Sequence, residues 1–357
     1  MTASRGGGLA AYEAGRRFEA LDGLRGVAAV GVMLYHIGSW TGRHGLVPHG
    51  YLAVDFFFCL SGFVLAHAYG RREIGWLGFM RQRLIRLWPL IALTMLLGAT
   101  VIIQHRERVP GWLGLGLLMI PRAWTSDDGF SPLFPLNPPA WSLFFELAVG
   151  AVWFPIRRLG VMGHVLMVVL LLPVMLYVAH GMGGVLTGWD RGTFVISFLR
   201  TIFAFLLGWG CYRIQAFTRW SAPVWLLAIV LAAVMSFPWT PLNWLYDFVC
   251  VSVVFPLMVL AGRRDPAGRL GSLCRVSGAI SYPLYALHWL GWELMLRGFR
   301  AIGGKGYPIG FALVAIPVII VCAWAVLKLY DEPVRRRLRA LLEKSRPGVG
   351  SGDSLPS

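Results

Sequence analysis

The sequence predicts an all-α protein, a polytopic helical bundle that crosses a membrane about ten times. Of its 357 residues, 57% are hydrophobic and only 14% are charged, and the mean hydropathy is +0.64. Soluble domains carry about a quarter charged residues. The apolar runs lack the two-residue alternation of a membrane barrel, so helices are the remaining way to satisfy the backbone in lipid.

Ten apolar stretches are predicted to cross the bilayer, at residues 21–38, 50–69, 88–103, 140–156, 163–179, 192–212, 222–238, 244–261, 276–296 and 308–327. The run from 111 to 120 is too short for a helix to cross about 30 Å of hydrocarbon. We interpret it as an interfacial or re-entrant segment within the loop 104–139. If it did span, every later segment would be inverted.

The distribution of Lys and Arg predicts that both termini are cytosolic. With the N-terminus inside, 23 of the 33 Lys and Arg residues lie in cytosolic segments and 8 lie in outer segments. Cytosolic loops of membrane proteins collect these residues. The formal net charge of +16 therefore reflects this topology and contact with anionic membrane lipids, and it does not indicate a nucleic-acid partner.

A single membrane domain is expected over residues 17–339, between disordered cytosolic segments at 1–16 and 340–357. The N-terminal segment is too polar for a cleavable signal peptide. The five cysteines are odd in number and far apart in the sequence, which predicts neither a disulfide framework nor a metal site. No phosphate-loop or dinucleotide motif is present, so no permanently bound cofactor is expected.

Arg25 and His36 lie inside the first apolar run and are predicted to share one helix face. Eleven residues of helix turn through about 1100°, close to three full turns. Ionisable side chains at membrane depth usually face a polar cavity and mark a functional path. The alternative is a snorkelling Arg25 and a His36 that only packs between helices.

Three further ionisable residues, Asp55, Glu146 and His288, are predicted to share the membrane depth of His36. Each alone has a structural explanation, as a helix-start carboxylate or a packing histidine. Their coincidence favours a common site, because unpaired charges in lipid are costly. Arg83 and Arg86 lie three residues apart before the third span, where two guanidiniums can grip phosphate. Their alternative role is a positive-inside anchor.

Six further segments follow one another along the chain. They are LDGLRG at 21–26 followed by His36, GYLAVDFFFCLSGFVLA at 50–66, the Arg83 and Arg86 pair before Trp88 and Pro89, AWSLFFE at 140–146, ISYPLYALHW at 280–289 and DEPVRRRLR at 331–339. In this order they resemble acyltransferase family 3, whose members are integral-membrane O-acyltransferases, and the resemblance covers about residues 17–339. The form expected is the membrane-only one, without a fused periplasmic hydrolase-like domain.

The resemblance implies transfer of an acyl group, with acetyl expected, from cytosolic acyl-CoA to a hydroxyl of a carbohydrate or glycolipid acceptor. Exopolysaccharide, lipopolysaccharide or another envelope glycan is the expected acceptor, and the bacterial inner membrane the expected location. His36 is the candidate general base, either directly or through an acyl-His36 intermediate, and Asp55 or Glu146 would hold its tautomer.

The remaining candidate residues bind the two substrates. The acyl-CoA phosphates would lie near Arg83, Arg86 and Arg25, and Arg25 is also a candidate donor to the thioester oxygen. Other candidate donors or contacts are Ser61, Ser142, Ser281, Tyr282 and His288. The outer loop 105–139, with Trp124, Asp127, Asp128 and Asn137, is either a saccharide-binding segment or an ordinary loop.

Two other classes of function use the same residues. A transporter or flippase for a lipid-linked saccharide would employ His36, Asp55, Glu146 and His288 as a proton relay. The sequence shows no pair of related halves, which such transporters often have. A scaffold for an envelope-assembly complex would tolerate loss of His36. Within the acyltransferase class, a glycosylated small metabolite is the alternative acceptor.

Overall fold

The computed structural model describes residues 18–42, 47–102, 105–122, 132–218, 220–306 and 309–344. These residues form helices and no strand, apart from an isolated bridge between Pro132 and Asp190. The all-α class predicted from composition is therefore confirmed. The predicted disorder of residues 1–16 concerns residues outside the described ranges.

Each predicted span contains a helix. The ten helices or composite helices are α2 Glu19–Thr41, α3 Ala53–Tyr69, α4 Trp76–Val101, α6 Ala140–Ile156, α7 Val161–Met182, α8 Phe194–Ile214, α9 Val224–Ser236, α10 Asn243–Val249 continuing through η4 Cys250–Val254 into α11 Phe255–Ala261, α12 Gly268–Ala301, and α13 Ile309–Val326 continuing through η5 Leu327–Asp331 into α14 Glu332–Lys344. Short 3-10 turns, η1 Gly50–Leu52, η2 Arg191–Thr193 and η3 Gln215–Phe217, adjoin α3 and α8.

Seven of the described helices are both long and apolar enough to cross a membrane. The helices α6 and α9 are apolar but shorter, and α12 is not among the seven. The structure thus supports a protein with many membrane-spanning helices. The number ten and the cytosolic position of both termini stay predictions.

The short run near residue 111 forms α5, Val109–Leu117, a helix of nine residues. At 1.5 Å per residue its length is about 13 Å, less than half of the hydrocarbon thickness. It packs against α4, where the Trp88 indole N–H donates to the Leu117 carbonyl at 2.7 Å. This geometry agrees with the interpretation of 111–120 as a segment that does not cross.

Three helices extend beyond their predicted ends. The helix α4 begins at Trp76 instead of 88 and therefore includes Arg83 and Arg86, and α12 begins at Gly268 instead of 276. At the C-terminus α14 continues to Lys344, so the prediction of a disordered tail from residue 340 is wrong for its first five residues. In each case the apolar run ends before the helix does, since polar residues continue a helix at the membrane edge.

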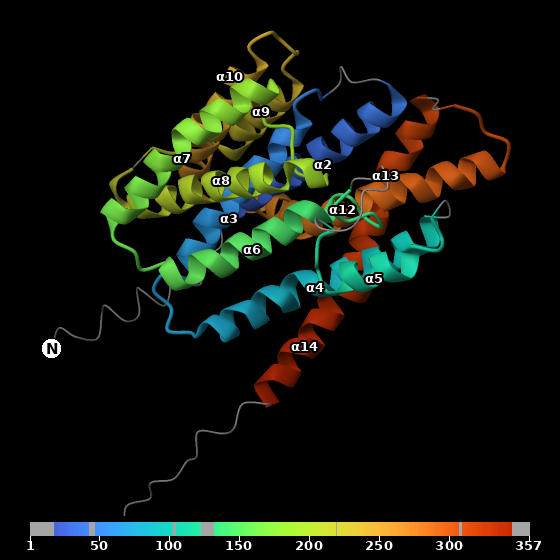
Figure 1. The fold of residues 1–357 in the computed structure, drawn as a ribbon, viewed down its shortest axis with the longest axis horizontal. Helices are drawn as coiled ribbons and strands as arrows, with labels where there is room; N and C mark the ends of the chain where they lie inside the picture. Colours follow the sequence, from blue (N-terminus) through green and yellow to red (C-terminus); the bar gives the residue numbers. More distant parts are fainter. Residues whose placement is uncertain are drawn as a thin grey trace, which may run out of the picture.

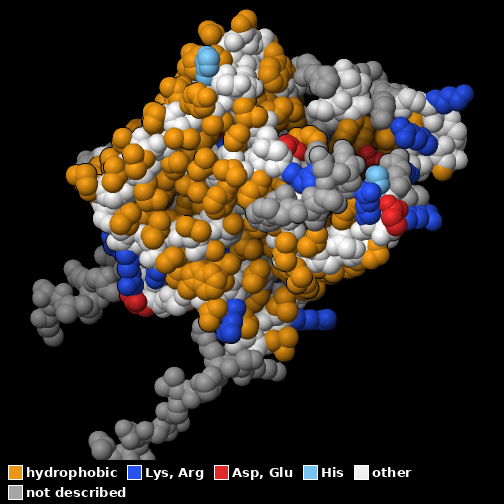
Figure 2. Space-filling view, viewed as in Figure 1, with side chains coloured by type: hydrophobic (Ala, Val, Ile, Leu, Met, Phe, Trp, Pro, Cys, Tyr) orange, Lys and Arg blue, Asp and Glu red, His pale blue; other side chains and the backbone are white. Residues whose placement is uncertain are grey.

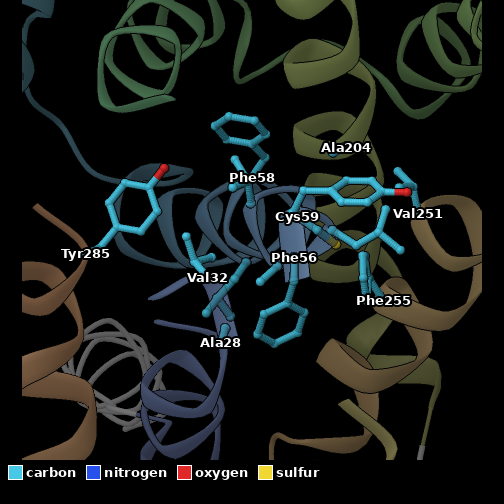
Figure 3. Packing of buried hydrophobic residues seen from close by; sticks show 14 of the residues in the cluster. Ala28, Val32, Phe56, Phe58, Cys59, Ala204, Val251, Phe255 and Tyr285 are labelled. Carbon is cyan, nitrogen blue, oxygen red and sulfur yellow. The ribbon is translucent and has the colours of Figure 1, made fainter. Parts of the chain in front are cut away.

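The bundle is held together by close helix contacts and aromatic packing. Helices α3, α6 and α7 run beside α8 (Figure 1). A Cβ atom added to Gly62 of α3 would lie 2.0 Å from the Phe205 carbonyl oxygen of α8. Small residues allow helix backbones to approach in this way in membranes. Figure 3 shows Phe56 and Phe58 of the same helix among the buried hydrophobic side chains.

The outer surface of the bundle is broadly apolar. On α7 the side chains of Leu166, Val169 and Leu170 are all more than half exposed, and Leu313 of α13 is 67% exposed. Figure 2 shows a wide hydrophobic face, with the visible Lys and Arg side chains toward its edges. A soluble monomer rarely exposes an apolar patch of this extent, so this surface is suited to contact with lipid.

Candidate active site

Three cavities follow one another between α2, α3, α4, α6 and α12. The His36 cavity measures about 870 Å³ and is rich in aromatic side chains, including Tyr35, Trp40, Trp141, Trp189, Tyr285 and Trp289. The Glu146 cavity is narrower, at about 190 Å³. The Arg339 cavity measures about 540 Å³, and nine of its 19 lining residues are charged, most of them on α2, α12 and α14.

Neighbouring cavities share walls. Val54 and Tyr285 line both the His36 cavity and the Glu146 cavity. The Glu146 and Arg339 cavities share six residues, which are Arg25, Leu60, Val64, Ala68, Arg86 and Tyr282. The helix α2 lines all three cavities. Arg25 lines the Glu146 and Arg339 cavities, and His36 lines the His36 cavity. This arrangement agrees with the common helix face that their spacing predicts.

His36, which lines the His36 cavity, lies next to His288 of α12. Their ring centroids lie 5.0 Å apart, and the His36 ring makes no hydrogen bond within the described part of the chain. The Nδ1 atom of buried His288 lies 2.6 Å from the Tyr285 carbonyl oxygen. Because a carbonyl only accepts, this Nδ1 carries a proton. The Nε2 atom of His288 has no partner among the described residues.

Asp55 and Glu146 do not contact His36. Asp55 is buried in a two-pronged ion pair with Arg200 of α8, whose Nε lies 2.7 Å from Oδ1, while a second guanidinium nitrogen bonds Oδ2. Glu146 accepts from Arg83 at 2.5 Å and from Ser61 at 2.9 Å. The prediction that one of these carboxylates holds the His36 imidazole is therefore wrong, since each is neutralised by a guanidinium from another helix.

The two arginines of the predicted phosphate-binding pair, Arg83 and Arg86, have different surroundings. Arg83 is 4% exposed and bound to Glu146. Arg86 is half-buried, lines both the Glu146 and Arg339 cavities, and has no hydrogen bond or ion pair within the described ranges. Arg25 lies at the same shared wall, 3.4 Å from Asp22. At this shared wall Arg86 is thus open to an anion, and Arg25 lies beside it with one carboxylate partner.

Most of the predicted hydroxyl donors are occupied. Ser281 donates to the Gly278 carbonyl at 2.7 Å, Tyr282 donates to the Leu87 carbonyl at 2.5 Å, and Ser61 donates to Glu146. Pro89 follows closely on Leu87, so Tyr282 bonds the backbone beside the proline inside α4. These contacts fix helices and leave the three hydroxyl protons unavailable to a substrate.

Tyr285 is a site residue that the sequence analysis missed. Its hydroxyl lies 2.6 Å from the Ser142 hydroxyl, and Ser142 also lies 3.1 Å from the Pro139 carbonyl oxygen. The tyrosine forms part of the wall between the His36 and Glu146 cavities. It precedes His288 by three residues within ISYPLYALHW, a spacing that places both side chains on one helix face. This spacing from His288 could have identified Tyr285 as a site residue from the sequence.

A second buried polar cluster beside the His36 cavity was also missed. The Tyr51 hydroxyl donates to Asp247 at 2.8 Å, and the Val185 backbone N–H donates to the same carboxylate at 2.9 Å. His49 bonds Asn243 at 3.1 Å.

Among the predicted loop residues, Asn137 donates to the Ala286 carbonyl at 3.0 Å, so its amide ties the loop to α12. Trp124, Asp127 and Asp128 lie outside the described residues.

The helices and cavities together define a membrane protein with three adjoining cavities in its interior. The family model described as "Acyltransferase domain" matches residues 18–327. The chain belongs to this acyltransferase family and is an O-acyltransferase. The family thus favours an enzyme over the transporter and scaffold alternatives. No solved structure matched the chain.

Several curated proteins are similar to parts of the chain. "Protein 2 in picA locus" of Rhizobium radiobacter is 39% identical over 46% of this chain and 94% of its own length. "Acyltransferase MdmB" of Streptomyces mycarofaciens is 32% identical over 40% of this chain and 42% of its own length. "Putative membrane-bound transacylase BcsY" of Komagataeibacter xylinus is 26% identical, over 76% of this chain and 72% of its own length.

Proposed function

We propose that this protein transfers an acyl group, with acetyl expected, from cytosolic acyl-CoA to a hydroxyl of an envelope carbohydrate at the bacterial inner membrane. The observation that carries the proposal is the series of three cavities with shared walls. In this proposal the charged end of the donor lies in the Arg339 cavity, and the hydroxyl-bearing acceptor lies in the His36 cavity. An "O-acetyltransferase OatA" of Staphylococcus aureus, 34% identical over 21% of this chain and 13% of its own length, supports the reaction class.

The His36 cavity suits a saccharide. Aromatic rings present flat apolar faces that stack on sugar rings, and several indoles and phenols form this wall. Its volume lies in the range of pockets that enclose small ligands. Arg200 and Tyr51, held by their carboxylate partners, add fixed polar groups to the same wall.

The chemistry assigned to this site is acid–base catalysis of acyl transfer. The neutral His36 imidazole takes the acceptor's hydroxyl proton while the oxygen attacks the thioester carbonyl carbon. The Tyr285 hydroxyl donates to the carbonyl oxygen as negative charge develops, while the Ser142 hydroxyl donates to the Tyr285 oxygen and positions it. The tetrahedral intermediate then expels the CoA thiolate, which takes the proton from the His36 imidazolium. A two-step route through acyl-His36 uses the same side chain as nucleophile.

Radiolabelled acetyl-CoA with purified protein and an envelope extract tests this proposal. We expect label in a carbohydrate product, and we expect His36→Ala to abolish it. His180→Ala is the matched control, because His180 is exposed on α7 and lines none of the three cavities. Equal elution volume and tryptophan emission of both variants would establish folding. Normal acylation by folded His36→Ala would show that the assigned base is wrong.

A further inference from the structure

The Arg339 cavity holds more positive charge than its carboxylates neutralise. Six arginines line it, namely Arg25, Arg86, Arg275, Arg335, Arg336 and Arg339. The three carboxylates in the same wall are Asp22, Asp331 and Glu332. This excess is gathered around a cavity of about 540 Å³, whose walls exclude part of the solvent that would otherwise screen it.

Half of these arginines already have carboxylate partners. Arg335 pairs with Asp331 at 2.7 Å, Arg25 lies 3.4 Å from Asp22, and Arg275 pairs with Glu19. Glu332 is bound by Lys328 at 2.7 Å. Arg86, Arg336 and Arg339 make no ion pair or hydrogen bond within the described part of the chain. Three guanidiniums of one cavity are therefore available to an anion with several charged oxygens.

We propose that Arg336 and Arg339 of α14 bind the 3′-phosphate of the donor's CoA moiety. This inference rests on the proposed function, because it takes acyl-CoA as the donor. A guanidinium offers paired N–H donors that match phosphate oxygens, and a phosphate monoester carries close to two charges at neutral pH. The site is thus assigned to a phosphomonoester attached to a nucleoside.

The order of the cavities assigns each part of the donor. The thioester lies at Tyr285, where the acceptor cavity begins. The unbranched pantetheine arm occupies the narrow Glu146 cavity of about 190 Å³. The diphosphate then reaches the shared wall of Arg25 and Arg86. Beyond that wall the adenosine enters the Arg339 cavity, where α14 presents its two unpaired guanidiniums.

The binding element belongs to a helix that the family match does not include. That match ends at residue 327, whereas α14 spans Glu332–Lys344. Three neighbouring arginines of α14 differ in position relative to the Arg339 cavity. Arg336 and Arg339 line it, and Arg337 does not. All three are exposed enough to be substituted without disturbing a buried core. Arg337 therefore supplies a control of equal charge on the same helix.

Binding to nanodisc-embedded protein tests the proposal, with CoA and dephospho-CoA as probes. Dephospho-CoA lacks only the 3′-phosphate. We expect Arg336→Ala with Arg339→Ala to weaken CoA binding at least about 10-fold, because the loss of a single charge-assisted contact already accounts for about that factor. Binding of dephospho-CoA should be unchanged, and Arg337→Ala should bind both probes like the original protein. The pair Arg336→Gln with Arg339→Gln repeats the test if the alanine variant does not fold.

The outcomes distinguish a failure of the acyl-CoA donor from a failure of the phosphate site on α14. If the original protein binds neither probe, the acyl-CoA donor is wrong and this site falls with it. If CoA binds equally well to the original and the double variant, α14 is not the site while the donor stands. An equal loss for both probes would reassign the arginines to another part of CoA and overturn the proposal. A loss seen only in nanodiscs with anionic lipid would show that they bind lipid headgroups instead.

Discussion

Replacing Asp55 by Asn is expected to destabilise the protein before it affects the chemistry. Asp55 is fully buried on α3, and its partner Arg200 is 2% exposed on α8. Asn keeps the shape of the side chain but removes the charge that neutralises the guanidinium. Outside this pair, Arg200 Nη1 donates to the Thr187 carbonyl oxygen at 2.7 Å, and the guanidinium lies 5.9 Å from the centre of the Trp141 ring.

The size of the effect follows from the burial of both partners. Breaking a buried ion pair from one side costs about 3–5 kcal/mol, because an uncompensated charge stays in a low-dielectric site. The Asn amide oxygen still accepts one bond, so we expect about 3 kcal/mol less free energy of unfolding. The double variant Asp55→Asn with Arg200→Gln removes both charges and should recover most of that loss.

Unfolding in mixed micelles, followed by tryptophan fluorescence, measures this difference. Asp190→Asn is the control, because Asp190 caps the turn η2 and Asn caps as well as Asp. A folding free energy of Asp55→Asn within about 0.5 kcal/mol of the original, the range of a neutral surface change, would refute the reasoning. If activity alone fell, Asp55 would act on the reaction instead of holding α3 to α8.

Two further predictions test the packing and the site. Gly62→Ala is expected to lower the free energy of unfolding by more than about 1 kcal/mol, since its Cβ would meet the α8 backbone, as in overpacked cores. Gly181→Ala, which meets nothing within 4 Å, should not lower it when both are measured by the same unfolding assay. Tyr285→Phe is expected to reduce the acylation rate about 100-fold, as loss of an oxyanion donor does. Tyr282→Phe, which loses a bond to α4, should keep most activity, and equal rates for the two would contradict the assignment of Tyr285.

Local features of the fold and site could be predicted from the sequence. Helix geometry alone relates Arg25 to His36, and both line the path of cavities. Apolar run lengths located a helix in every predicted stretch, because burial in lipid leaves the backbone few alternatives. Shared depth likewise brought His36 near His288.

Long-range pairing could not be derived in the same way. Asp55 and Arg200 are 145 residues apart, and depth alone did not show which helices would be neighbours. Arg200 lies inside the predicted span 192–212, and this position was an unused signal that a carboxylate from another span faces it. The donors Ser281 and Tyr282 were misjudged for a related reason: the bundle had already given each a backbone carbonyl.

The wall formed by Val54 and Tyr285 has an electrical consequence in the proposed reaction. Carrying one elementary charge across 100 mV costs about 2.3 kcal/mol, and CoA bears several. At this partition the acyl group passes to the acceptor while the acceptor's proton passes to the CoA thiolate, so the charges of CoA stay on their own side. The membrane voltage then does no work on the transfer, and the thioester alone supplies the driving force.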